Sequence, residues 1–260
     1  LKMKNFTQKF IGLFALLLTI SFTVNAQDNY SMSFDGDDDW VEASSISIYD
    51  TITNSLTISS WVKLDEDFND YGTIIARRNF VGNPSGERHH FELTILPTRG
   101  IFFSTANNEN DDLYSAQLET ESELLNKNQW YYLSLTFENG IVSFYVNGEL
   151  ILANDFGYKE MFPNNHWINF GRIRRSGGQQ FFNEFNGQIR KVELWDSVLS
   201  QDDILSFMNC PPIGDESNLV GYWNFNEGSG DNASEPILLI FPGITPKSPA
   251  GNESILISAF

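Results

Sequence analysis

Four aspartates surround one glycine near the start of the chain, at positions 35 and 37–39. Carboxylates gathered on a tight loop are the hard oxygen ligands that Ca²⁺ takes, with backbone carbonyls and water completing the shell. We therefore expect Asp35, Asp37 and Asp38 to hold a structural Ca²⁺. The alternative is that these acids only cap a turn.

Aromatic side chains outside the core are the second chemical signal, because sugar rings stack on exposed Trp or Tyr while polar neighbours bind hydroxyl groups. Four tryptophans, at 61, 130, 195 and 223, lie in strand-like runs and are expected in the core. Loop-adjacent residues, including Arg78, Arg172 and the asparagine at 108, are more often plain surface. The predicted ligand-binding residues are Trp40, Tyr71, Arg77, Asn107, Trp167 and Arg174.

The residues needed for catalysis are missing from the sequence. No Glu-x-Asp-x-x-Glu string of the kind that places two glycosidase acids in one cleft occurs. Glu119, Glu121 and Glu123 alternate, but a solvated edge explains that polar stretch better. His89, His90 and the histidine at 166 have no metal-ligand spacing. We expect no catalytic residues and no enzymatic activity.

Charge and composition restrict the partners. A formal net charge of -18 argues against a nucleic-acid partner, whose phosphates are bound by Lys and Arg. A hydrophobic content of 41% over 260 residues allows one full core, and 22 Phe against 4 Met favours pleated surfaces. Cys210 is the only cysteine, so no internal disulfide supports the fold.

The N-terminus reads as a secretory leader. Lys2, Lys4 and Lys9 precede the apolar run 10–20, and small residues end at Ala26, where we expect cleavage. That run is shorter than the roughly 20 residues of a membrane span, and no later apolar run reaches that length. The predicted domains are residues 1–26 as signal peptide, 27–209 as one sandwich, and 210–260 as a linker, one further strand and a weakly ordered tail.

Two Asn-Gly pairs, at 139–140 and 147–148, divide residues 130–153 into three strand-like runs. Asn-Gly is the strongest short hairpin signal, and two-residue turns would fix the register. Apolar side chains would then pair on one face and polar ones on the other, which predicts a β-meander that covers a core. The predicted apolar pairs are Phe137 with Val142, Leu135 with Phe144 and Leu133 with Val146.

Further strand-like runs occupy residues 30–34, 40–43, 56–64, 72–76, 91–96, 101–105, 167–170, 188–195 and 219–225. One segment reads as a helix, with Ser200 as N-cap and acids in its first turn. Alternation fails near Arg190 and Lys191, which predicts a β-bulge there. Many strands with one late helix predict an all-β, two-sheet antiparallel jelly-roll sandwich.

Residues 33–41, 56–62, 130–148 and 186–200 carry a resemblance. In this order they resemble the LamG-like (laminin G type 3) jelly-roll domain of the concanavalin A-like lectin/glucanase group, over residues 29–208. The resemblance implies a concanavalin A-like sandwich that often carries a structural calcium ion.

The preferred interpretation is a secreted, non-catalytic module that binds a glycan or another extracellular ligand, with Ca²⁺ stabilising a loop. The alternative is an adhesion or structural module of a larger cell-surface protein, which would bind an extracellular protein. A polysaccharide hydrolase is the third hypothesis, since loops can assemble carboxylates that sequence spacing hides.

Overall fold

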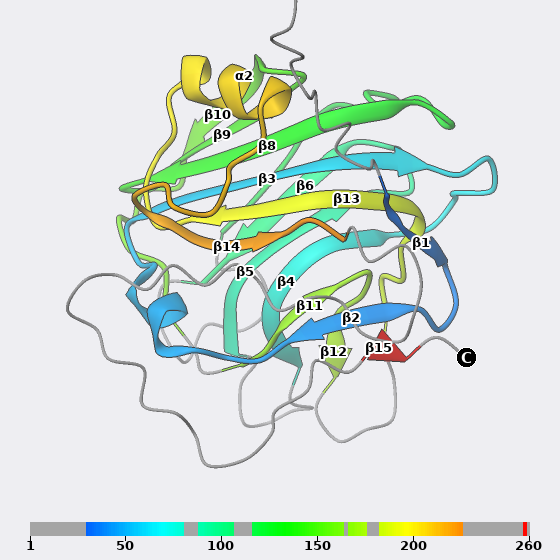
Figure 1. The fold of residues 1–260 in the computed structure, drawn as a ribbon, viewed down its shortest axis with the longest axis horizontal. Coiled ribbons are helices and arrows are strands. Elements are labelled where there is room, and N and C mark those ends of the chain that lie inside the picture. The colour runs from blue at the N-terminus through cyan, green and yellow to red at the C-terminus, as the bar shows by residue number, and fades with distance from the viewer. Residues whose placement is uncertain are drawn as a thin grey trace, which may run out of the picture.

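Two antiparallel sheets form the body of the protein. The computed structural model describes residues 30–80, 88–106, 116–163, 166–175, 182–225 and 257–258. The expected signal peptide and nearly all of the expected C-terminal tail lie outside these residues. In Figure 1 the long strands of the first sheet cross β4, β5 and β6 of the second. The predicted all-β sandwich is confirmed.

Sheet A, the first sheet, has the strand order β1-β13-β3-β8-β9-β10, with β14 also paired to β13. Its strands are β1 (Met32–Asp35), β3 (Ser55–Leu64), β8 (Trp130–Glu138), β9 (Ile141–Val146), β10 (Glu149–Asp155), β13 (Asn186–Trp195) and β14 (Leu219–Trp223).

Sheet B, the second sheet, has the order β15-β2-β11-β4-β5-β6-β7, with β12 parallel to β4. Its strands are β2 (Trp40–Ala43), β4 (Gly72–Phe80), β5 (Arg88–Ile95), β6 (Ile101–Thr105), β7 (Ala116–Glu119), β11 (Ile168–Phe170), β12 (Arg174–Arg175) and β15 (Ile257–Ser258).

The β-meander forms as expected in sheet A. Asn139 and Gly140 have φ values of 49° and 97°, and Asn147 and Gly148 have 52° and 81°, as two-residue hairpin turns require. Phe137 pairs with Val142, and the other two predicted apolar pairs are also confirmed. The local turn chemistry and the apolar pattern therefore specify one register.

The predicted bulge in β13 is confirmed. The register between β13 and β3 shifts between Arg190 and Glu193, and Lys191 has a φ of 57°. The bulge divides β13 into two halves with different neighbours along one edge. Residues 186–189 pair with β1, and residues 192–195 pair with β14, which extends the sandwich beyond residue 209.

Within the described residues, two helical segments accompany the sheets. Helix α2 (Gln201–Asn209) begins with the predicted cap, because Ser200 Oγ accepts a hydrogen bond from the backbone N–H of Asp203. Its Phe207 ring packs on Trp195 with 4.8 Å between centroids. A 3₁₀ helix, η1 (Ser47–Thr51), was not expected from the sequence. Its five residues are too few to show a helical period.

The core lies between the facing sides of the two sheets. Across sheet B, one row of paired residues on that side is entirely apolar: Val41, Phe170, Ile75, Leu93, Phe103 and Leu118. Trp195 and Trp223 are buried as expected. The expectation that Trp61 and Trp130 belong to the core is wrong, because both lie half-buried on the outer face of sheet A.

Candidate functional site

A row of polar residues crosses the outer face of sheet B. Glu42 of β2 pairs with Asn169 of β11, which pairs with Ala76 of β4. The row continues through Glu92 of β5 and then through Ser104 and Gln117 of β6 and β7. Because side chains alternate across a strand, these residues point away from the adjacent apolar row. We call these six residues, of which only Ala76 is apolar, the polar row.

Most of the polar row is withdrawn from solvent. Glu42 is 8% exposed, and Asn169, Ala76, Glu92 and Ser104 are each 1% exposed or less. The carboxylate of Glu92 accepts hydrogen bonds from Arg78 NH1 at 2.5 Å and from Thr94 Oγ1 at 2.8 Å. Buried charges need such partners, and removing one of them typically costs several kcal/mol. The side chain of Glu92 is therefore held in one position by its hydrogen bonds.

Asn169 is the exception in the row. Its Nδ2 donates to the carbonyl oxygen of Trp167 at 3.2 Å. Its Oδ1 is buried, and no hydrogen-bond donor among the described residues reaches it. A buried acceptor without a donor costs free energy, so a hydroxyl or amide group that reaches Asn169 would gain a hydrogen bond at little further cost.

Trp40 and Trp167 lie on either side of the pair formed by Glu42 and Asn169. Trp40 is two residues before Glu42 in β2, and Trp167 is two residues before Asn169, just ahead of β11, so each is about 7 Å from the pair. The guanidinium of Arg172 sits over the Trp40 ring, 3.2 Å from its centroid. Trp167 is 37% exposed. The fold thus brings two of the predicted ligand-binding residues to one corner of sheet B.

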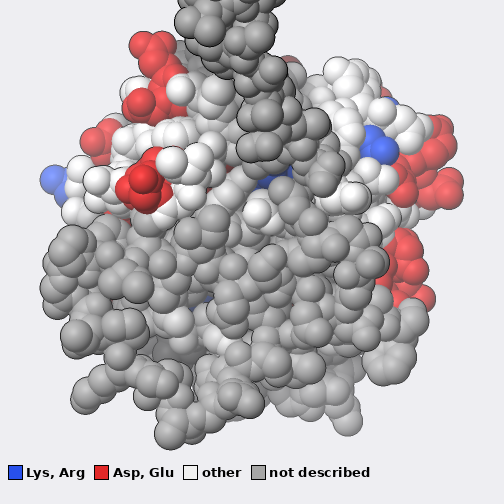
Figure 2. All heavy atoms as spheres, viewed as in Figure 1, with Lys and Arg blue, Asp and Glu red and all other residues white. Residues whose placement is uncertain are grey.

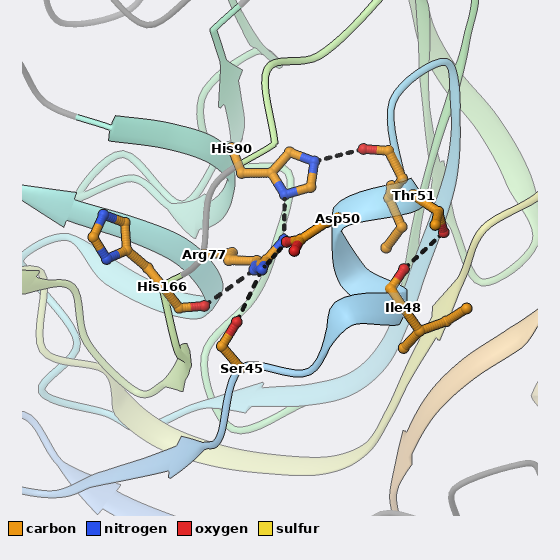
Figure 3. A network of polar contacts seen from close by, with 8 residues as sticks. Ser45, Ile48, Asp50, Thr51, Arg77, His90 and His166 are labelled. Atoms are coloured by element: carbon orange, nitrogen blue, oxygen red, sulfur yellow. Dashed lines mark hydrogen bonds and ion pairs between the residues drawn. The ribbon is translucent and has the colours of Figure 1, made fainter. Parts of the chain in front are cut away.

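The expectation that Arg77 lies beside a loop is wrong. Arg77 belongs to β4, its side chain is fully buried, and it joins η1 to the sheet (Figure 3). Its NH2 donates to Asp50 at 2.6 Å and to Ser45 at 3.1 Å, and its Nε donates to the His166 carbonyl oxygen at 3.1 Å. An arginine with these acceptors has a structural role.

The other predicted ligand-binding residues are dispersed. Tyr71 is 44% exposed and precedes β4, at the opposite end of that strand from Arg78. Arg78 and Arg172 were also expected next to loops, but both are buried against sheet B. Asn107 lies outside the described residues. Arg174 is placed in β12, but its side chain is not described.

The acidic turn between β1 and β2 brings Asp35, Asp38 and Asp39 together, with one carboxylate oxygen from each lying within 4.8 Å of the others. Asp37 is not in this group, although its backbone N–H donates to Asp35 Oδ1 at 3.0 Å. Of the three predicted calcium ligands, the structure thus brings Asp35 and Asp38 together and adds Asp39 to them. In Figure 2 acidic side chains gather at the right edge, where this turn and the loop after β3 lie.

Electrostatics at the turn favour a cation. Burial, followed by the charges of Asp35 and Asp38, raises the pKa of Asp39. Burial and the charge of Asp37 raise the pKa of Glu184, which faces the same turn. A bound divalent cation would relieve this repulsion, and an all-oxygen donor set suits Ca²⁺. The residues present therefore fit a calcium ion.

The laminin G type 3 family model, described as the concanavalin A-like lectin/glucanases superfamily, matches residues 35–205. The chain belongs to this family. A comparison with curated proteins finds no match.

Solved structures share the laminin G type 3 fold. A putative carbohydrate binding protein from Bacteroides ovatus ATCC 8483 is 18% identical with a TM-score of 0.59, over 79% of this chain and 54% of that one. The CBM40 of a Ruminococcus gnavus IT-sialidase, bound to α2,3 sialyllactose, is 17% identical with a TM-score of 0.53, over 68% and 97%. A SAP-like pentraxin from Limulus polyphemus is 15% identical with a TM-score of 0.52, over 70% and 83%.

The superfamily description includes glucanases, so the carboxylates of this laminin G type 3 domain need a geometric test. Glu42 and Glu92 are three strands apart in the polar row. Three strand spacings amount to about 14 Å, whereas glycosidase carboxyl groups stand about 5–9.5 Å apart. This pair does not have the separation of a general acid and its nucleophile or base.

The sequence interpretation missed the polar row as a site. Its members come from strands that are distant in the chain, and only the pairing of those strands brings them together. A usable signal was present, because Glu42, Asn169 and Glu92 are each a lone polar residue between apolar neighbours.

Among the described residues, no helix is both long and apolar enough to cross a bilayer.

Proposed function

We propose that this laminin G type 3 domain is a non-catalytic module that binds carbohydrate at the corner of sheet B between Trp40 and Trp167. The exposed indole of Trp167 offers a flat apolar surface to a sugar ring. Glu42 and Asn169 between the two indoles offer acceptors to sugar hydroxyls.

The observation that carries this proposal is the buried Oδ1 of Asn169, which no donor among the described residues reaches. A folded protein rarely leaves a buried acceptor without a donor, and here the acceptor lies beside an exposed tryptophan. Two of the solved structures with this fold are named for carbohydrate binding, which supports the same class of ligand. The wide separation of Glu42 from Glu92 favours binding over hydrolysis.

Calcium is the proposed cofactor, with a structural role. Asp35, Asp38 and Asp39 would hold the ion, and it would supply the positive charge that this turn lacks. The turn leads directly into β2, which carries Trp40 and Glu42. Ordering the turn would therefore support one side of the proposed carbohydrate site.

Export and the role in a longer protein are also proposals. The basic and apolar residues before Ala26 support secretion. The chain spans 54% of the Bacteroides ovatus protein that it matches, so the activity of any larger assembly is inferred only at the level of a binding module.

A glycan array followed by isothermal titration tests this function. We expect the wild-type protein to bind at least one glycan class and to release no reducing ends from it. Trp167→Ala and Asn169→Ala should each weaken binding about tenfold, since each removes a contact worth about 1–2 kcal/mol. Tyr71→Ala removes an aromatic residue that is 44% exposed, against 37% for Trp167, and lies elsewhere on the protein, so it should leave binding unchanged.

Two outcomes would contradict the proposal. Absence of binding on the array and in titration, with and without calcium, would remove the binding function. Binding that survives Trp167→Ala and Asn169→Ala in folded protein would place the site elsewhere. Near-ultraviolet circular dichroism of each variant shows whether the fold is intact.

A further inference from the structure

A second cluster of chemistry-bearing side chains lies on the outer face of sheet A, on the opposite side of the sandwich from the polar row. Lys63 of β3 pairs with Trp130 of β8, and Arg190 of β13 pairs with Trp61 of β3. All four side chains are half-buried. We call these four residues the cation–indole cluster.

The guanidinium of Arg190 lies between the two indoles. Its Cζ is 5.2 Å from the Trp61 ring centroid and 4.9 Å from the Trp130 ring centroid. The ammonium of Lys63 is 5.6 Å from the centroid of Trp130. Both cations are thus within the distance at which the face of an aromatic ring attracts positive charge.

Arg190 has no counter-ion among the described residues. Its Nε is buried without a hydrogen-bond partner there, and burial alone lowers the pKa of the guanidinium. The nearby carboxyl of Glu193 is held neutral at pH 7, because burial raises its pKa to about 8. In a chain of net charge -18, two cations beside two indoles and with no ion pair to an acid among the described residues are an unbalanced arrangement.

Charge and shape together define what this surface accepts. A planar guanidinium donates to carboxylate and sulfate groups in a bidentate manner, and a neighbouring ammonium adds a second charge-assisted contact. The indole faces accept the apolar face of a sugar ring. A neutral sugar would leave both cations without a counter-ion, and a simple inorganic anion would leave the indoles uncovered.

We propose that the cation–indole cluster is a second carbohydrate-binding surface, specific for saccharides that carry a carboxylate or sulfate group. The anionic group pairs with Arg190 and Lys63, and the sugar ring lies on Trp61 and Trp130. This site goes beyond the function proposed for the polar row and lies on the other sheet.

Titration with matched oligosaccharides tests the proposal on the full chain. The probes are a galacturonic acid tetrasaccharide, a sulfated chondroitin tetrasaccharide and the neutral cellotetraose. We expect one or both acidic probes to bind and the neutral probe not to bind at this face. Arg190→Gln and Trp130→Ala should weaken acidic binding about tenfold, and Lys63→Gln about threefold.

Lys159→Gln removes one positive charge from an exposed residue outside the sheets and serves as the matched control. It should leave acidic binding unchanged. Trp167→Ala tests independence from the polar row and should also leave binding of the acidic probes unchanged. Thermal unfolding of each variant confirms that the fold is retained, and Lys63→Gln, which removes no hydrogen bond to a described residue, remains informative if a tryptophan variant is unstable.

Uronate binding with no sulfate binding, or the reverse, identifies the source of the anionic group and supports the proposal. Failure of both acidic probes to bind the wild-type protein would overturn it. Acidic binding that persists in folded Arg190→Gln and Lys63→Gln would also overturn it. Loss of acidic binding in Trp167→Ala alone would assign these ligands to the polar row instead.

Discussion

Arg77 determines the tautomer of His90. Arg77 NH1 lies 3.1 Å from His90 Nδ1, and a guanidinium has only donors, so Nδ1 is the acceptor. The imidazole proton must therefore be on Nε2, which donates to the carbonyl oxygen of Ile52 at 2.6 Å. Burial, reinforced by the charge of Arg77, lowers the pKa of His90 to about 3.

The first prediction concerns acid. The neutral His90 of the folded state contributes stability that is fully present above the unfolded pKa near 6.5 and is lost as the pH falls through 3. His90→Gln can accept from Arg77 and donate to Ile52 without titrating. Between pH 6 and 3 the wild-type free energy of unfolding should fall relative to this variant by up to about 1.4 kcal/mol per pH unit. Urea unfolding at a series of pH values measures the unfolding free energy of both proteins. If the two free energies change with pH in parallel, the lowered pKa of His90 is contradicted.

The second prediction concerns Glu193, whose Oε2 accepts a hydrogen bond from the Tyr132 hydroxyl at 3.1 Å. Burial raises the pKa of Glu193 from 4.5 to about 8. Its contribution to stability is fully present below pH 4.5 and is lost as the pH rises through 8. The unfolding free energy of wild type should therefore fall relative to Glu193→Gln over that interval, by up to about 1.4 kcal/mol per pH unit.

These two groups act in opposite directions over a shared interval. Between pH 4.5 and 6.5 their slopes offset each other, so together they contribute a plateau of stability. In His90→Gln the unfolding free energy should fall with rising pH over this interval, because only the Glu193 contribution remains. In Glu193→Gln it should rise, and in the double variant it should again be level. A plateau that stays level in both single variants would show that neither pKa is shifted as described.

The third prediction separates backbone strain from steric overlap at two glycines. Gly140 and Gly157 both have a left-handed backbone, with φ values of 97° and 79°. A Cβ at Gly140 would overlap the carbonyl oxygen of Tyr158, whereas one at Gly157 meets nothing within 4 Å. Gly157→Ala should cost about 1–2 kcal/mol from strain alone, and Gly140→Ala about 3–4 kcal/mol because overpacking adds to it. Chemical denaturation measures both; equal costs would mean that the segment carrying Tyr158, after β10, moves aside freely.

The fourth prediction tests the calcium ligands. At about 10 mM Ca²⁺, a site with a dissociation constant of about 10⁻⁴–10⁻³ M would stabilise the fold by about 1.4–2.7 kcal/mol. Asp38→Asn should abolish most of this gain, since Asp38 belongs to the carboxylate group. Asp37→Asn removes the same charge from the neighbouring residue, which is not in this group, and should retain the stabilisation by calcium. Thermal unfolding with calcium and with a chelator gives the comparison, and an equal response of both variants would indicate general screening of acidic repulsion.

Local sequence chemistry was sufficient for much of sheet A. Asn-Gly turns require positive φ, so their positions determine the meander and its register. The failure of alternation near Lys191 located the bulge, and Ser200 located the start of α2. In each case the decisive interaction lies within a few residues of the signal.

Features that depend on distant partners could not be predicted in this way. Strand β7 is a short polar edge strand whose pairing with β6 is its main support. Arg77 looked like a surface residue because its acceptors come from η1 and from the segment before β11. Trp61 and Trp130 point outward because the register of β3 with β8 assigns the inner face to Val62 and Tyr131. Likewise, the polar row exists only once the strands of sheet B are paired.

The divided edge of β13 has a consequence for synthesis on the ribosome. A nascent chain that has emerged only as far as α2 contains every other described strand of sheet A, but β14 is still to come. Until residues 219–223 emerge, residues 192–195 have unpaired backbone N–H and C=O groups along this edge. Another polypeptide could form strand hydrogen bonds with them. Translation of β14, the last described strand of sheet A, rather than of the helix before it, is the moment at which this edge of sheet A becomes protected from mispairing.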